Sequence, residues 1–308
     1  MTAPDVSIVV VSYRTRELTL AALRSVFAET TPGTFELLVV DNASDDGSAD
    51  AIEAEFGDRL TLIRSTENLG FAAANNLAGE RARGRLLLLL NPDTVVLDRA
   101  IDRLVAFAGE RPEARIWGGR TLFPDGSLNP ASCWQRITPW STVCMATGLR
   151  ALFRGSEWLN PEAMGSWPRD SVREVDIVVG CFLLIGLEDW RALGGFDLRY
   201  WMYGEEADLC LRARALGARP AITPDATIVH LVGASSPDDV RKKTLVTKAR
   251  VTLVRTHWPA WQRPFGLAMF WLWALLEDVA ARARRRPRPH GSLFSRRADW
   301  LTGYPASS

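Results

Sequence analysis

Four short apolar runs, each followed by a segment of helix length, constrain the fold of this chain more than any other feature of its sequence. The runs are predicted strands, at residues 6–11, 35–40, 60–63 and 85–90. Helical patterns follow them over 17–27, 48–56, 71–81 and 99–107. Continuously apolar strands separated by helices are typical of a parallel sheet that is covered on both faces. We therefore predict an α/β, Rossmann-like fold with a mostly parallel central sheet.

Each of the four predicted strands is followed by polar or glycine residues. In open α/β sheets, ligands bind beyond the carboxyl ends of the strands, so these exits are candidate binding residues. A single polar exit is equally explained by turns and helix caps, whereas four in succession favour a shared site. The exits are Ser12-Tyr13-Arg14, Asp41-Asn42 with the residues up to Gly47, Asn68-Leu69-Gly70, and Asn91-Pro92-Asp93.

The sequence lacks the two common phosphate-binding loops. No GxGxxG follows the first strand and no GxxxxGK[ST] is present, which argues against a dinucleotide site and against a P-loop. A phosphate ligand would then need another source of positive charge. Asp93 is well placed to hold a divalent cation such as Mg²⁺, which commonly takes one or two carboxylates and leaves its other positions to phosphate and water.

Charge is unevenly distributed along the 308 residues. The whole chain carries a net charge of +1, which argues against a generic nucleic-acid binder. Residues 241–308 nevertheless contain fourteen Lys/Arg and three Asp/Glu, so residues 1–240 have ten more acidic than basic residues. The four cysteines show no zinc-binding spacing and are expected to be reduced thiols of a cytosolic protein. No signal peptide is evident, and the longest apolar run, 265–276, is too short to span a bilayer.

Several segments together resemble glycosyltransferase family 2, in order and in approximate spacing, over about residues 5–260. The pair Asn68-Leu-Gly-Phe-Ala and Asn91-Pro-Asp is similar to the rhamnosyltransferase-like branch of that family. The other matching segments are 6–14, 39–48, 194–197, 203–210, 230–235 and 255–259. The resemblance implies a GT-A fold, a nucleotide-sugar donor, a divalent cation (Mg²⁺ or Mn²⁺) and inversion at the anomeric carbon.

The resemblance also assigns roles to the strand exits. It implies that Tyr13, Asp41 and Asn42 hold the nucleoside, with Ser12 and Arg14 beside them. Asn68, Gly70, Asn75 and Asn91 would line the donor crevice, and Asp93 would occupy the metal position of the family's DxD-type motif. His230 would be a second metal ligand, although from the residues alone it is as well explained as a core histidine. We expect the acceptor to contact Gly180, Cys181, Trp201 and Tyr203.

Three acids open a predicted helix that runs from about Glu205 to residue 216. At 100° per residue, Glu206 falls inside an apolar arc that includes Leu216, Glu205 lies at its edge and Asp208 lies further round. Acids in a first turn also suit the helix dipole, but that does not explain a glutamate on the buried side. The family's motif has Asp at the position of Glu206, so the resemblance makes Glu206 the first candidate for the catalytic base, followed by Asp208 and Glu205.

The C-terminal part is rich in tryptophan and arginine. A helix over 265–276 followed by Arg282 to Arg288 suits the interface of an anionic membrane, reached through residues 264–297. A helix docked on the body, a dimer contact and a disordered basic tail are the alternatives. We predict a GT-A domain over 1–240, with a nucleotide-sugar half (1–115) and an acceptor half (116–240), and a helical, basic, membrane-associating segment over 241–308.

We therefore predict a metal-dependent inverting glycosyltransferase at the cytoplasmic face of the plasma membrane, or otherwise in the cytoplasm. It would move a sugar, first L-rhamnose from dTDP-L-rhamnose, to a lipid-linked or polymeric cell-envelope glycan. The alternatives are a family 2 transferase with another donor such as a UDP-sugar, a polyprenyl-phosphate glycosyl synthase, and a catalytically silent glycan-binding or assembly subunit. A homo-oligomer is left open.

Overall fold

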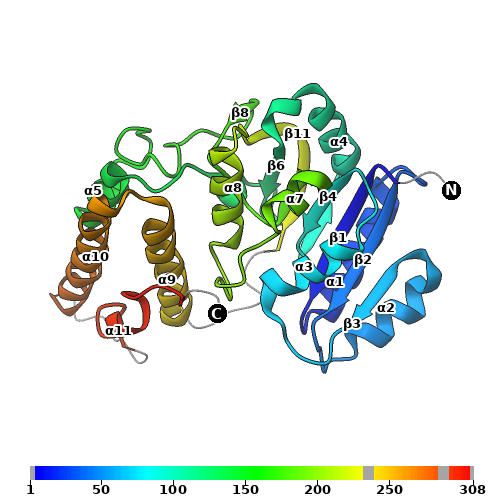
Figure 1. The fold of residues 1–308 in the computed structure, drawn as a ribbon, viewed down its shortest axis with the longest axis horizontal. Coiled ribbons are helices and arrows are strands. Elements are labelled where there is room, and N and C mark those ends of the chain that lie inside the picture. The colour runs from blue at the N-terminus through cyan, green and yellow to red at the C-terminus, as the bar shows by residue number, and fades with distance from the viewer. Residues whose placement is uncertain (1–3, 232–238, 284–290, 306–308) are drawn as a thin grey trace. The chain divides into compact units, whose positions relative to one another are not determined.

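A computed structural model describes residues 4–231, 239–283 and 291–305, and these form two compact units (Figure 1). Unit 1 collects Met1–Trp134, Pro168–Asp197 and Leu209–Val232, and unit 2 collects Gln135–Trp167, Leu198–Asp208 and Gly233–Ser308. The units are therefore distributed along the chain differently from the linear division at residue 240, which stays a prediction about domains. Each unit is described by itself.

Unit 1 is built on a sheet of nine strands. The four strands predicted from the apolar runs are confirmed as β1 (Val6–Ser12), β2 (Phe35–Asp41), β3 (Thr61–Arg64) and β4 (Leu86–Leu90). They pair in parallel in the order β3-β2-β1-β4. This arrangement confirms the prediction of an α/β fold with a mostly parallel sheet.

The register of these strands brings their polar exits to one edge of unit 1. Ser12 pairs with Asp41 across β1 and β2, and Val10 pairs with Leu90 across β1 and β4. All residues of β1 and β4 are buried, which explains why both strands are apolar on both faces. Polar residues cluster where the strands leave the sheet, although Ser12, Asp41 and Asn42 are themselves buried there.

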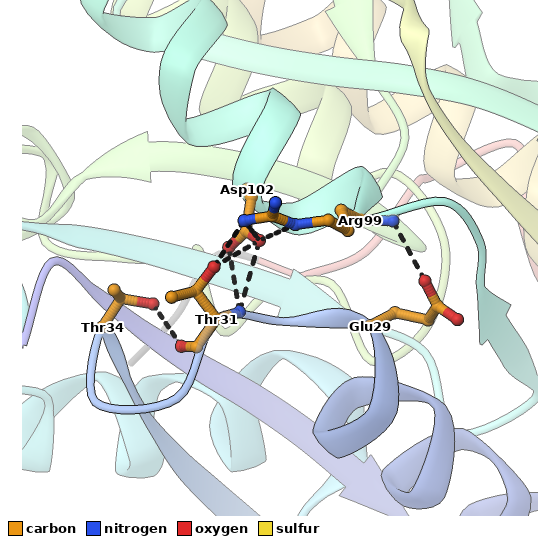
Figure 2. A network of polar contacts seen from close by, with 5 residues as sticks. All are labelled: Glu29, Thr31, Thr34, Arg99 and Asp102. Atoms are coloured by element: carbon orange, nitrogen blue, oxygen red, sulfur yellow. Dashed lines mark hydrogen bonds and ion pairs between the residues drawn. The ribbon is translucent and has the colours of Figure 1, made fainter.

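Helices cover this parallel part of the sheet at the predicted places. They are α1 (Arg16–Glu29), α2 (Ser48–Phe56), α3 (Gly70–Arg81) and α4 (Ala100–Glu110). A polar network ties the loop after α1 to the start of α4 (Figure 2). The Asp102 carboxylate accepts hydrogen bonds from the Thr31 hydroxyl at 2.8 Å and from Arg99 Nε at 2.9 Å, while Arg99 N donates to Glu29 at 3.2 Å.

The rest of the sheet mixes strand directions. The apolar stretch 175–185 forms the two-residue strand β9 (Ile177–Val178) and β10 (Phe182–Gly186). β10 runs antiparallel to β4 and is followed by the helix α7 (Leu187–Leu193). The remaining strands are β5 (Thr94–Val96), β6 (Ile116–Leu122), β8 (Arg173–Glu174) and β11 (Ala221–His230), and β9 pairs with β7 (Cys133–Trp134) in a separate small sheet. β11 pairs in parallel with β6 and antiparallel with β5.

Unit 2 is helical. It contains α5 (Pro139–Ala146), α6 (Leu149–Leu152), α9 (Asp239–His257), α10 (Arg263–Ala283) and α11 (Arg297–Trp300), together with the first residues of α8 (Glu205–Ala215), which continues into unit 1. Within this unit α10 packs against α5 and α9. α10 extends beyond the predicted helix at both ends, because Arg263 and Pro264 start it and Ala280 to Ala283 continue it.

This longer helix changes one prediction. Ala260–Ala283 is long and apolar enough to cross a membrane by length and composition, with a mean hydropathy of 1.3 and 22% of its apolar window buried. The sequence run 265–276 had seemed too short for that. The arginines at 284–288, which belong to the predicted basic segment, lie outside the described residues.

Candidate active site

The exits of β1 and β2 in unit 1 hold buried polar side chains. Ser12 is buried, and its hydroxyl contacts the Thr19 hydroxyl at 2.9 Å. Asp41 is also buried, with Oδ2 accepting from Ser44 N at 3.1 Å, while Oδ1 has no hydrogen-bond partner. An unpaired buried carboxylate oxygen is costly unless a ligand donates to it. Among the residues predicted to bind the donor, Asp41 is therefore the one whose buried, unpartnered oxygen could accept a hydrogen bond from a ligand.

The Asn42 side chain joins the exit of β2 to the start of α3. Its Oδ1 accepts from Leu69 N at 2.9 Å, and its Nδ2 donates to Asn68 Oδ1 at 3.0 Å. Asn68 Oδ1 also accepts from Gly70 N at 2.9 Å. These amides hold one another in place, so their local role is to fix the loop that the sequence assigned to the donor crevice.

The other predicted donor residues differ in exposure. Asn75 is buried inside α3 and donates to Phe71 O at 2.8 Å, which makes it a helix-internal contact. Tyr13 is exposed, and the Arg14 guanidinium lies 5.2 Å from its ring centroid. Arg14 also pairs with Asp45 at 2.6 Å. Tyr13 is thus an accessible aromatic surface at the same strand exits.

Asp93 and His230 meet in unit 1, as the sequence predicted. The antiparallel pairing of β11 with β5 sets His230 opposite Thr94, so its ring reaches the neighbouring Asp93. His230 Nε2 lies 3.2 Å from Asp93 Oδ1 and 3.4 Å from Asn91 Nδ2. Asp93 O accepts from Leu231 N at 2.9 Å, which fixes the two segments together. The rest of the matching segment, 232–235, lies outside the described residues.

The electrostatics of this pair favour a positive charge between its members. Burial acts to lower the pKa of His230, but hydrogen bonds with Asp93 and Cys181 outweigh it and raise the pKa to about 10. In the described part of the chain no group of three or more His, Cys, Asp or Glu side chains could hold a metal ion. One carboxylate and one imidazole nevertheless fit a divalent cation that takes its remaining ligands from a bound phosphate and water.

The predicted acceptor residues Gly180 and Cys181 lie just before β10. Both are buried, and Cys181 O accepts from Asn91 N at 3.2 Å. Cys181 thereby joins the start of β10 to the exit of β4, beside Asp93. Its contact with His230 was not foreseen from the sequence, because nothing in the spacing links positions 181 and 230.

The acidic turn at the start of α8 belongs to unit 2. Its first residues follow a strained corner, in which Tyr203 has φ 69° and Gly204 has φ 94°. Only glycine adopts the second conformation without strain, and a Cβ there would lie 3.0 Å from Ala249 and 3.1 Å from Tyr200. Glu205 and Glu206 follow this corner directly and lie close enough for their charges to interact.

The pKa values of both glutamates are raised. Burial, and then the charge of Glu206, raise the pKa of Glu205 well above its usual value, and burial also raises the pKa of Glu206. One oxygen of each, Oε2, is buried without a hydrogen-bond partner. Glu205 is 5% exposed, whereas Glu206 is half-buried. Glu206 is therefore the more accessible of the two carboxylates.

The face of α8 differs from the helical-wheel prediction. Asp208, expected further round the helix, is only 1% exposed, and its Oδ1 lies 2.8 Å from His257 Nε2 at the end of α9. Leu216, expected on the buried arc, is exposed because α8 ends at Ala215. Sequence reasoning missed His257, since its partner lies 49 residues away and no local pattern connects them.

The loop before α8 is held by the C-terminal segment of the chain. Tyr304 N donates to Thr252 Oγ1 at 2.8 Å, and the Tyr304 hydroxyl donates to Met202 O at 2.9 Å. Its ring packs edge-on against Tyr200. Trp201 is exposed in this loop, and the pKa of the half-buried Tyr203 is raised by burial and by the charges of Glu205 and Glu206. Tyr304 was also missed by the sequence analysis.

Unit 1 has the GT-A fold. A mannosyltransferase from Pyrobaculum calidifontis, solved in complex with GDP-Man and Mn²⁺, has the same fold, with a TM-score of 0.59 and 22% identity over 94% of this chain and 78% of that one. Residues 7–158 match the family described as glycosyl transferase family 2. The matched region, nearly half of the chain, thus belongs to glycosyltransferase family 2.

The curated relatives point in the same direction. An O-antigen biosynthesis protein, RfbC, of Myxococcus xanthus is 29% identical over 85% of this chain and 20% of that protein. An N-acetylglucosaminyl-diphospho-decaprenol L-rhamnosyltransferase of Mycobacterium tuberculosis is 28% identical over 63% of this chain and 66% of that protein. The matched region thus spans between a fifth and two thirds of these relatives. The chain is thus similar to a protein of O-antigen biosynthesis and to a rhamnosyltransferase.

Proposed function

We propose that the chain transfers L-rhamnose, with inversion, from dTDP-L-rhamnose to a lipid-linked or polymeric glycan of the cell envelope at the cytoplasmic face of the membrane. The observation that carries the proposal is the 3.2 Å pairing of Asp93 with His230 at the exit of β4. This is the strand edge at which α/β folds bind nucleotides. The rhamnosyltransferase among the relatives, and the O-antigen protein, support the donor and the acceptor class.

The donor would bind at the exits of β1, β2 and β4. Asp41 Oδ1 is a free buried acceptor, and a thymine or uracil base has one ring N–H to donate to it. Tyr13 would stack on the nucleoside, with Ser12, Arg14, Asn42, Asn68 and Gly70 shaping the crevice, whereas the buried Asn75 would only support the start of α3 from within. Asp93, His230 and the neighbouring Asn91 would hold Mg²⁺ or Mn²⁺. When bound, the cation would act as a Lewis acid that stabilises the charge of the leaving diphosphate.

The acceptor would be activated by the acidic turn. We propose Glu206 as the base, because its pKa is raised and its side chain is the more accessible of the two unpaired glutamates. It would take the proton from the acceptor hydroxyl as that oxygen attacks the anomeric carbon. The bond from that carbon to the nucleoside diphosphate breaks, and the diphosphate leaves with the electron pair. Glu205 is the alternative base, and Asp208, Gly180, Cys181, Trp201 and Tyr203 would complete the acceptor side.

A donor panel tests this proposal. Purified full-length chain is mixed with dTDP-L-rhamnose, UDP-sugars or GDP-mannose, with Mn²⁺, Mg²⁺ or a chelator, and thermal shift and donor turnover are recorded. We expect stabilisation by dTDP-L-rhamnose that depends on the metal. Transfer from a UDP-sugar alone would replace the donor assignment, and no response to any donor would favour the silent-subunit alternative.

The Asp93→Ala variant tests the metal side of the proposal. It should lose the metal-dependent thermal shift and at least about 100-fold of turnover, the usual loss when a group that stabilises developing charge is removed. Glu110→Gln, which changes an exposed acid at the end of α4, is the matched control and should behave like the parent chain. A metal-dependent shift that survives in Asp93→Ala would contradict the role of Asp93.

A further inference from the structure

Helix α10 in unit 2 has one face that is docked within its own unit. Its buried residues recur every four positions, as Gly266, Phe270, Ala274 and Asp278. A Cβ at Gly266 would lie 2.8 Å from Trp258 and 3.1 Å from Val254, so the missing side chain lets α10 approach α9 closely. The Arg250 guanidinium lies 5.4 Å from the Phe270 ring centroid. These contacts fix the helix along α9.

The opposite face of α10 is also apolar, and the described residues of unit 2 cover it only in part, since Leu272 and Leu275 are half-buried there. Its residues recur at intervals of three and four, and they lie about half a turn away from the docked face. Phe265, Leu276 and Val279 are exposed, and Trp261, in the 3-10 turn Ala260–Gln262 just before the helix, is 79% exposed. The whole outer face comprises Phe265, Ala268, Leu272, Leu275, Leu276 and Val279. A surface helix of a soluble unit normally presents polar residues there.

Helix α6 adds further apolar surface beside α10. The Arg150 guanidinium lies 5.6 Å from the Trp273 ring centroid, which places α6 next to α10 within the unit. Leu152 is 75% exposed and Phe153 is also exposed. We use the name "outer apolar face" for the six outward residues of α10 with Trp261, Leu152 and Phe153.

The ionic contacts of α10 argue that the helix lies along a membrane rather than across it. Lys243 of α9 pairs with Glu277 at 3.1 Å, and Arg282 pairs with Asp278 at 2.8 Å. If α10 crossed a bilayer, these charges and the α9 helix docked beside them would enter the hydrocarbon at a high cost. An interfacial position leaves the charged docked side in water and buries the apolar side.

The charge of this part of the chain indicates which surface covers the outer apolar face. Residues 241–308 have eleven more basic than acidic residues, and Trp261 and Trp271 are exposed in or next to α10. Tryptophan prefers the headgroup region, and basic side chains are attracted to anionic lipids. We propose that the outer apolar face is a docking surface for an anionic lipid bilayer, on which α10 lies in the plane of the interface. This proposal does not depend on the donor or on turnover.

Vesicle sedimentation of the full chain, without donor or metal, tests the proposal. We expect binding to phosphatidylcholine vesicles that contain a third of phosphatidylglycerol, weaker binding to pure phosphatidylcholine, and release at high salt. The double variant Leu276→Glu with Val279→Glu should lower the bound fraction at equal lipid more than tenfold, because each change removes an apolar side chain from the interface. Leu216→Glu, at an exposed position in unit 1, is the matched control and should bind like the parent chain.

Three outcomes would overturn the proposal. One is equal sedimentation of the parent chain and the double variant, provided that both have the same circular dichroism spectrum. Another is a concentration-dependent dimer, seen by light scattering without lipid and abolished by the double variant, which would assign the face to a second copy of the chain. The last is retention in vesicles through alkaline carbonate, which would indicate a spanning helix. Quenching of tryptophan fluorescence by lipids brominated near the headgroup would support the interfacial position.

Discussion

The two units of this protein differ in where their apolar side chains lie. In unit 1 the central strands β1 and β4 are buried along their whole length, and the ion pair of Arg64 with Asp50 lies at the surface. Unit 2 contains the largely buried ion pair of Arg250 with Glu162. Of the fifteen large hydrophobic side chains that are exposed among the described residues, twelve belong to unit 2.

The two units therefore differ in what stabilises them and in where their predicted site residues lie. Unit 1 is stabilised by an apolar sheet, and most of its predicted binding residues come directly after the strands. Unit 2 holds carboxylates in its interior, so its stability depends on which of them are ionised. It also exposes apolar side chains, which we propose contact a lipid bilayer. We therefore expect single substitutions in unit 2 to change turnover, stability or the pH dependence of stability one at a time, more clearly than substitutions in unit 1 do.

The largest expected effect concerns the division of labour between the units. Glu206→Gln in unit 2 should lower turnover by about 10²- to 10⁴-fold, the usual contribution of a general base. Donor affinity, measured by calorimetry with Mn²⁺, should stay within twofold, since the predicted donor residues belong to unit 1. A weakened donor affinity would show that unit 2 also builds the donor site. Near-normal turnover would move the base to Glu205 or Asp208.

A smaller effect is expected from the interior ion pair of unit 2. Burial acts to raise the pKa of Glu162, but the charge and hydrogen bonds of Arg250 outweigh it and lower that pKa. The pair therefore stabilises the fold above the ordinary glutamate pKa, and this stabilisation is lost as pH falls through the lowered value. Glu162→Gln should cost about 3 kcal/mol at pH 7, because it leaves the Arg250 charge without its partner.

Urea unfolding followed by tryptophan fluorescence measures this change, because nine of the twelve tryptophans belong to unit 2. Glu53→Gln removes an exposed partner of Arg64 in unit 1 and is the matched control, for which we expect no measurable loss. If the two variants lose the same stability, the contrast between interior and surface pairs does not hold.

The smallest effect has the opposite sign and occurs in the same unit. Because the pKa of Glu205 is raised, the folded state holds its proton more tightly than the unfolded chain, so ionisation of Glu205 lowers stability as pH rises above the ordinary value of 4.5. Glu205→Gln should therefore stabilise the protein at pH 7 by on the order of 1 kcal/mol, since one pKa unit corresponds to about 1.4 kcal/mol. The gain should vanish below pH 4.5 in the same unfolding assay. A gain that is independent of pH would point to packing instead of charge.

The sequence predicted the parallel part of unit 1, β1 to β4, because its signals are local, but it did not predict β5, β6, β8 and β11. Each of these strands, such as Leu86–Leu90, is indicated by a continuous apolar run, and its exit residue is the next residue in the chain. The meeting of Asp93 with His230 was also within reach, but only through the resemblance to a family. Periodicity alone gives no reason to join positions 137 residues apart.

Unit 2 was harder to predict because its contacts join residues that are distant in sequence. For the same reason a helical wheel did not predict which residues of α8 are buried. Asp208 is buried by His257 at the end of another helix, so an arc drawn on α8 alone misjudged it. Leu216 was misplaced because the helix ends one residue before it. The apolar run in α10 was identified, but its length was underestimated because flanking polar residues such as Arg263 and Arg282 are part of the helix.

The bond from Tyr304 to Met202 has a consequence for the order in which the protein is made. The two residues are separated by 102 positions, and the bond closes over the strained corner that precedes the acidic turn. During translation the strands of unit 1 leave the ribosome long before this residue does. A nascent chain can thus assemble early the sheet edge that we propose to bind the donor, while the turn proposed to activate the acceptor gains this restraint only after Tyr304 has emerged.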